Sequence, residues 1–136
     1  MKWSVFVSLY AIALPLFLLI DALWLKFIAK DFYASRLTHL LGEVNWTAAA
    51  LFYPLYLVGV IFFAVYPATL MSSWKMAALY GGLFGFFTYL TYDLTNLATL
   101  KDWPTSVVVV DILWGVFVGS VVSAATVAIY LSYKSV

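Results

Sequence analysis

Hydrophobic residues fill four long runs of the chain, and polar residues gather in the stretches between them. Each run is long enough for the ~20 helical residues that cross the hydrocarbon core of a membrane. The pattern therefore predicts an all-α integral membrane protein, a four-helix bundle that forms a single transmembrane domain over residues 1–136. The expected helices cover residues 3–27, 46–66, 73–100 and 105–132.

The longest polar stretch, residues 28–45, separates the first two runs. Within it, apolar side chains recur at helical spacing while most polar side chains fall on the other face. This spacing predicts a short amphipathic interfacial helix on the membrane surface, although an irregular polar loop fits the same residues. The apolar positions are Tyr33, Leu37, Leu40, Leu41 and Val44.

Composition supports a membrane location and excludes several function classes. Hydrophobic residues make up 66% of the chain and charged residues only 10%, against about 25% charged in soluble domains. The net charge of +1 and the lack of a basic tail give no nucleic-acid signature. No cysteine is present for a disulfide or thiolate site, and the single histidine, His39, has no second for a haem or zinc site. No cofactor is expected.

Three carboxylates interrupt the apolar runs, and charged side chains inside a membrane are functional candidates by default. Counting outward from the turn at residues 101–104 places Asp93 and Asp111 at the same depth, with Asp21 in the same half of the membrane. Each acid has a partner three residues on, and hence on the same helix face. These pairs are Asp21 with Trp24, Asp93 with Asn96, and Asp111 with Trp114.

Aromatic side chains are expected around these acids. Trp114 lies deeper than the other tryptophans, and its buried indole N–H needs a partner that a carboxylate would supply. Aromatic faces beside carboxylates make a cation site, whereas the same hydroxyls and acids can instead bond one another between helices. The tyrosines at comparable depth are Tyr53, Tyr56, Tyr89 and Tyr92.

Close acids in a low dielectric cannot all be ionised cheaply, so either some carry protons or a cation neutralises them. Both states can switch, as in proton-coupled carriers. A divalent ion held by the three acids and Asn96 is chemically reasonable as well, and the sequence leaves the metal question open.

Small residues form one strip on each of the last two helices, at Gly81 and Gly85 and at Gly115 and Gly119. Small residues let membrane helices approach closely, so these strips predict the packing face, with Gly85 opposite Gly119. A second repeated pattern, Asp-x-Leu-Trp, occurs at residues 21–24 and 111–114. It hints at an inverted duplication, although four matched letters also arise by chance.

Several segments together resemble a known family. They are Tyr92 to Thr99, Trp103-Pro104, Val110-Asp111, Trp114-Gly115, Asp21 to Leu25, Phe32-Tyr33 and Asn45-Trp46. These residues resemble an uncharacterised family of small bacterial four-helix membrane proteins, catalogued as domain of unknown function 2177. The resemblance implies a multi-pass protein of the bacterial inner (plasma) membrane and supplies no activity.

Three functions compete at this point. The first is a proton-coupled carrier or binder of a small cation or amphiphile, which uses the acids and aromatic rings. The second is a non-catalytic accessory or assembly subunit whose acids pair inside the bundle. The third, a lipid-modifying enzyme with a divalent ion, ranks last because no nucleophile–base pair is present. Expected partners are the lipid bilayer, a small cationic or amphiphilic ligand and a second copy of the chain, with no nucleic acid.

Overall fold

The computed structural model describes residues 1–134, and all regular structure in that range is helical. The first run is helix α1 (Trp3–Leu23) with the π-helix η1 (Trp24–Ile28), and helix α2 (Lys30–Leu37) follows in the first loop. The second is α3 (Trp46–Val60), the π-helix η2 (Ile61–Val65) and α4 (Tyr66–Leu70). The last two are α5 (Trp74–Thr99) and α6 (Thr105–Lys134).

Three helical runs are long and apolar enough to cross a membrane: Trp3–Ile28, Trp46–Leu70 and Thr105–Lys134. Helix α5 has 26 residues but does not belong to this set, because threonines, an asparagine and an aspartate lower its hydropathy. The all-helical class is thus confirmed and three candidate membrane spans are present, while a bundle of four crossings stays a prediction.

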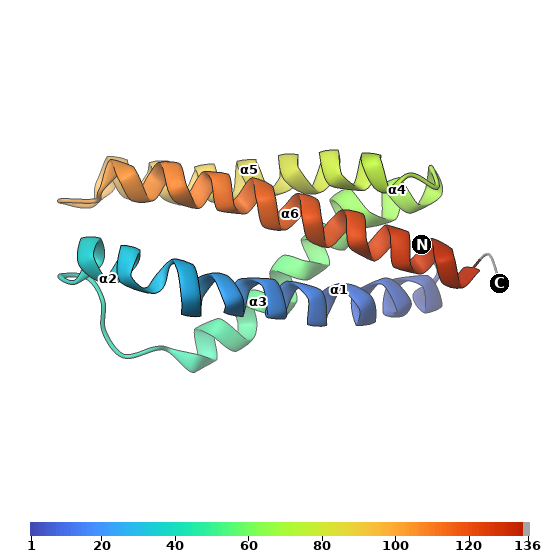
Figure 1. Cartoon of the computed structure of the whole chain (residues 1–136), viewed down its shortest axis with the longest axis horizontal. Helices are drawn as coiled ribbons and strands as arrows, with labels where there is room; N and C mark the ends of the chain where they lie inside the picture. The colour runs from blue at the N-terminus through green and yellow to red at the C-terminus, as the bar shows by residue number, and fades with distance from the viewer. Residues whose placement is uncertain (135–136) are drawn as a thin grey trace.

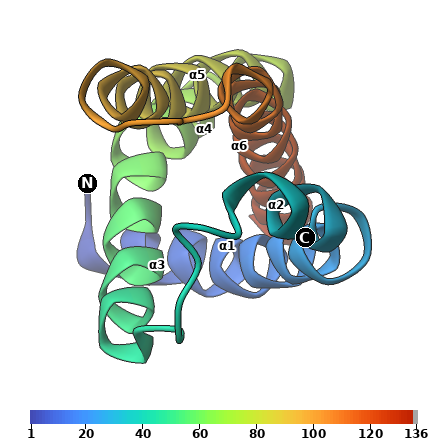
Figure 2. The same cartoon turned by 90° about the vertical axis from the view of Figure 1, so that its left-hand side faces the viewer.

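The long helices run side by side along the longest axis of the molecule (Figure 1). Seen along that axis, α1 and α5 lie on opposite sides, with α3 and α6 on the other two (Figure 2). Helix α2 and the turn at residues 101–104 lie at one end, on the left of Figure 1, and the N-terminus lies at the other. The most extensive contact between two elements joins α5 to α6, and α1 packs chiefly on α6.

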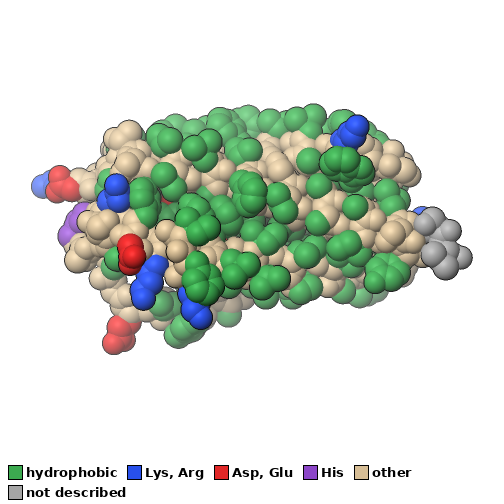
Figure 3. Space-filling view, in the orientation of Figure 1, with side chains coloured by type: hydrophobic (Ala, Val, Ile, Leu, Met, Phe, Trp, Pro, Cys, Tyr) green, Lys and Arg blue, Asp and Glu red, His purple; other side chains and the backbone are tan. Residues whose placement is uncertain are grey.

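Hydrophobic side chains cover the middle of the visible face, and charged side chains gather toward its two ends (Figure 3). Large apolar residues are exposed on every long helix, for example Leu19, Leu55 and Phe117. An exposed apolar belt between polar ends is the surface that lipid-contacting helices present. This surface agrees with the contact to lipid that the sequence predicts.

Glycines bring the backbones of α5 and α6 into direct contact. A Cβ atom built on Gly85 would lie 1.9 Å from the carbonyl oxygen of Gly115, and one on Gly81 would lie 2.1 Å from that of Gly119. Gly85 therefore lies closest to Gly115, one helical turn from the expected register, although a Cβ on Gly119 would still come within 3.6 Å of the Gly85 Cα. Counting residues outward from the turn gives only an approximate register. Two glycine faces interlock in steps of about one helical turn, so the packing can differ from the count by a whole turn.

The register of this contact also separates two of the acids in depth. When the pairing of Gly85 with Gly115 is extended toward the turn at residues 101–104, Asp111 comes level with Tyr89. Asp93 then lies about one helical turn, ~5 Å, closer to that turn. Asp93 and Asp111 were expected at equal depth, but the contact between α5 and α6 places them about one helical turn apart.

Helix boundaries differ from the expectations at two places. The second run was expected to end before Pro67 but continues to Leu70, because Pro67 lies in the first turn of α4, where its missing N–H is not needed. The first loop forms a helix only over Lys30–Leu37, so Leu40, Leu41 and Val44 lie outside it and are exposed. The side chain of Asn45 accepts a bond from the backbone of Ala48 at 3.0 Å and caps α3.

The Gly85→Ala substitution should destabilise the protein. Its new methyl group would overlap the Gly115 carbonyl, so α5 and α6 must separate, at the ~1–3 kcal/mol typical of overpacking. The measurement is thermal unfolding in detergent, followed by circular dichroism. The matched control is Gly42→Ala, where a Cβ meets nothing within 4 Å. Equal melting of both variants would contradict the close contact.

Candidate functional site

Asp21 lies on the buried face of α1, where every fourth residue, Leu9, Ala13, Phe17 and Asp21, points into the core. Its carboxylate accepts bonds from the Tyr53 hydroxyl of α3 at 2.7 Å and from the Trp114 indole N–H of α6 at 3.3 Å. One buried acid thus joins three helices. Two donors satisfy it, which is how a buried polar group acts as a structural link.

The two Asp-x-Leu-Trp units meet at this link. The rings of Trp24 and Trp114 stack with centroids 4.3 Å apart and planes 7° apart. The expected partner type for the Trp114 N–H, a carboxylate, is present, but it belongs to Asp21 across the helix interface and not to the neighbouring Asp111. Trp24 starts the π-helix η1, a type of irregularity common near functional sites.

Asp111 is held by a different helix, since its carboxylate accepts a hydrogen bond from the Tyr33 hydroxyl of α2. Helix α2 is fixed there by Arg36, whose Nε donates to the Ser106 hydroxyl of α6 at 3.1 Å. Burial raises the pKa of Tyr33 above its usual range, and the bond to Asp111 raises it further, so this hydroxyl stays a donor at neutral pH.

The bond from Tyr33 to Asp111 is a contact that was not expected of α2, whereas the location of this helix on the membrane surface stays a prediction. Its apolar face is turned toward the end of the bundle, with Tyr33 and Leu37 half-buried. The signal that could have found it is the hydroxyl on an otherwise apolar helix face, because a hydroxyl that is buried needs a partner. The sequence contains three acids that could supply one and does not say which.

Asp93 has a third environment. Its side chain is 0% exposed, and neither carboxyl oxygen has a hydrogen-bond partner. The Trp103 indole lies close enough to interact with it, yet its N–H is also buried and unbonded. Asn96, one turn further along α5, is partly exposed. Asp21 therefore has two hydrogen-bond donors, Asp111 has one and Asp93 has none.

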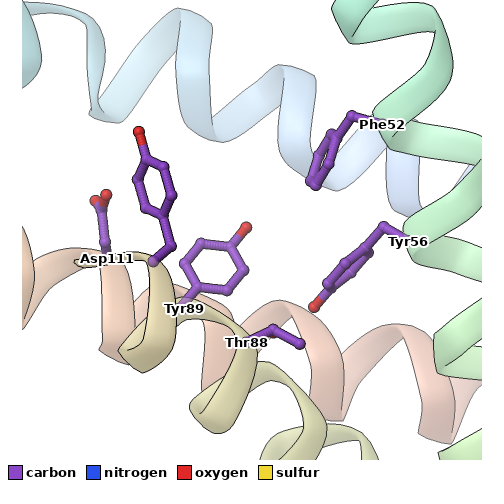
Figure 4. A pocket seen from close by; sticks show the side chains of 6 residues that line it. Phe52, Tyr56, Thr88, Tyr89 and Asp111 are labelled. Carbon is purple, nitrogen blue, oxygen red and sulfur yellow. The ribbon is translucent and has the colours of Figure 1, made fainter. Parts of the chain in front are cut away.

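A pocket of about 250 Å³ opens beside Asp111. The second helical run contacts α5 chiefly through η2, whereas α3 diverges from α5. The pocket lies in the space between these two helices. Figure 4 shows Asp111 at one end, Phe52 and Tyr56 at the other, and Tyr89 between them. The Tyr56 hydroxyl is buried without a partner. The lining residues are Phe52, Tyr56, Thr88, Tyr89, Tyr92 and Asp111.

The expected site residues thus fall into separate groups. Asp111, Tyr56, Tyr89 and Tyr92 line the pocket, while Asp21, Tyr53, Trp24 and Trp114 form the bonded and stacked cluster. Asp93 and Asn96 belong to neither group. Phe52 and Thr88 were not expected in the site. Thr88 belongs to a series of threonines at residues 88, 91, 95 and 99 of the sequence, whereas nothing in the sequence distinguishes Phe52. Within residues 1–134, no three acids, histidines or cysteines come together to hold a metal.

Comparison with known proteins yields one match. A family model described as "Predicted membrane protein (DUF2177)" matches residues 6–128 of the chain. No curated protein and no solved structure matches. The match covers both Asp-x-Leu-Trp units, the glycine contact and every residue that lines the pocket.

The Tyr53→Phe substitution should lower the stability of the protein, because it removes one of the two donors of the buried Asp21. Leaving a buried acceptor short of a partner costs about 1–3 kcal/mol. Thermal unfolding in detergent measures this, with Tyr10→Phe as the control: Tyr10 has only a 3.4 Å bond to the Pro54 carbonyl. If the two variants melt alike, Asp21 does not link the helices.

Proposed function

The chain belongs to the DUF2177 family of predicted membrane proteins, and from this premise we propose that it binds a small organic cation or cationic amphiphile and exchanges it for protons. The protein then spans the bacterial inner membrane four times. The observation that carries the proposal is the pocket, in which four aromatic rings and one carboxylate converge.

A carboxylate among aromatic rings favours a cation over other ligands. The negative charge of Asp111 attracts the cation, and the faces of Tyr89 and Tyr92 add cation–π attraction in a low dielectric. Phe52 and Tyr56 at the far end suit an apolar tail. The volume of about 250 Å³ lies just below the ~300–1,000 Å³ of most ligand pockets, so a small molecule fits best.

Four crossings require α5 to span the membrane despite its polar residues. At 26 residues it is about 39 Å long, enough for the ~30 Å hydrocarbon core. Its exposed threonines bond their own helix: Thr91, Thr95 and Thr99 each donate to the carbonyl four residues earlier at 2.6–2.7 Å. Hydroxyls satisfied in this way can face lipid.

Helix α2 is suited to control access to the carboxylate. The Tyr33 hydroxyl donates to Oδ1 of Asp111, an oxygen atom that a cation would approach, so ligand binding and this bond compete. The Trp24 indole lies within interaction range of the same hydroxyl and has no other partner. Tyr33 therefore keeps a polar neighbour when a cation takes its place on Asp111.

A second candidate is the accessory subunit, supported by one observation. Asp21 is fully bonded by Tyr53 and Trp114 between three helices, as a purely structural acid would be. That reading accounts for Asp21 but leaves the pocket beside Asp111 and the unbonded Tyr56 hydroxyl without a role. The binding function accounts for both.

The Asp111→Asn substitution should abolish or strongly weaken cation binding, because the neutral amide keeps the shape but loses the attracting charge. Losing one partner of a desolvated charge pair costs 2 kcal/mol or more, a rise in Kd of roughly thirtyfold. The measurement is calorimetric titration of the purified protein with benzyltrimethylammonium. Asp31→Asn makes the same charge change on an exposed position of α2 and should bind as wild type. Equal binding by both variants would exclude Asp111 as the cation site.

The Tyr33→Phe substitution should have the opposite effect. Removing the competing hydroxyl frees Asp111, and a hydrogen bond to a charged group is worth about 1.5–3 kcal/mol, so affinity should rise by about tenfold or more. The same titration measures it, with Tyr133→Phe as a control because Tyr133 is exposed at the end of α6. Weaker binding by Tyr33→Phe would show that Tyr33 contacts the ligand and does not compete with it.

A further inference from the structure

We propose that Asp93 is the proton-binding site of this protein and that Asp111 is its cation-binding site, so that each ligand has its own carboxylate. The inference rests on the proposed function for the cation, since it assigns the proton of the exchange to a particular residue. Asp93 is a buried acid that neither lines the pocket nor belongs to the bonded and stacked cluster around Asp21.

Asp93 is built to hold a proton when no cation is bound. Its side chain is 0% exposed and both carboxyl oxygens lack partners. An ionised carboxylate in such a place is far costlier than the neutral acid, which needs less solvation. Asp21 has two donors and Asp111 has one, so hydrogen bonds stabilise a negative charge on those two residues and do not do so on Asp93.

The groups that face Asp93 determine when its proton leaves. They are Asp111 on α6, Tyr33 on α2 and Trp103 in the turn before α6. The charge of Asp111 opposes ionisation of Asp93, while Tyr33 is a neutral hydroxyl. When a cation neutralises Asp111, that repulsion disappears. The O–H bond of Asp93 can then break, with the proton passing to water and the electron pair staying on the carboxylate.

Trp103 provides the means of stabilising the ionised state. Its indole N–H is buried and unbonded and lies beside the Asp93 carboxyl. Its ring also packs edge-on against Tyr92 of the pocket wall at 6.0 Å. A small shift of the turn would complete a charge-assisted hydrogen bond. Trp103 is thus a positioning residue that contacts both the proton site and a side chain lining the cation pocket.

The experiment counts protons released when benzyltrimethylammonium binds to the purified full-length protein in weakly buffered detergent with a pH indicator. This cation has no titratable proton, so every proton released comes from the protein. We expect wild type to release up to one proton per cation and its affinity to rise with pH by up to about tenfold per unit. Asp93→Asn should bind with no release and no pH dependence. Asp102→Asn, a charge-matched change at an exposed position of the same turn, should behave as wild type.

A second variant covers the case in which Asp93→Asn does not fold. Trp103→Phe keeps an aromatic ring against Tyr92 but removes the N–H, so the pH dependence should move to higher pH. Proton release that persists in Asp93→Asn, binding to wild type without release, or an unmoved pH dependence in Trp103→Phe would each overturn the assignment to Asp93.

A measurement without ligand separates this inference from the cation proposal. Infrared difference spectroscopy of wild type against Asp93→Asn, at neutral pH, should show one carboxylic-acid C=O band that belongs to Asp93. If no cation binds but the band is present, the cation function fails and the proton site stands. If the band is absent and appears only on acidification, Asp93 is ionised at neutral pH and the inference fails.

Discussion

The contact between the glycine faces of α5 and α6 determines the geometry on which the rest of the molecule depends. Backbone atoms of Gly81 and Gly85 lie against the carbonyls of Gly119 and Gly115 with no room for a side chain between them. Apolar packing against lipid gives little preference for one register, because lipid tails are as apolar as the helices. Interlocking backbones supply that preference. The depth of Asp111 relative to Tyr89 and Asp93 follows from it.

Three aspartates have different environments in this structure. Asp21, Asp93 and Asp111 lie in the same half of the protein, yet they have two hydrogen-bond donors, none and one. The number of donors decides whether a buried carboxylate is a structural link, a neutral acid or a charge open to a ligand. A single cluster of three equivalent acids would bind one ion. Three separate environments allow a structural role and a binding role to coexist.

The short helix α2 connects the first loop to this arrangement. It has eight residues, too few to be stable alone, and it is held by side chains that reach α6: Tyr33 to Asp111 and Arg36 to Ser106. Losing the bond between Tyr33 and Asp111 would therefore remove one of the two contacts that hold α2. The π-helix η1 precedes it, and π-helical turns of this kind occur frequently at functional sites.

The sequence by itself determined the helical class, the membrane location, the approximate helices and the identity of the small and acidic residues, because hydrophobic run length and residue type are local properties. The N-cap at Asn45 and the glycine strips belong to the same category. Only the tertiary structure decided that Gly85 meets Gly115, that Trp114 bonds Asp21, that Tyr33 reaches Asp111 and that Phe52 lines the pocket. Each of these depends on the rotation and offset of one helix against another. Such quantities arise from packing between segments far apart in the chain, where a shift of one turn leaves the hydrophobic pattern unchanged and replaces every partner.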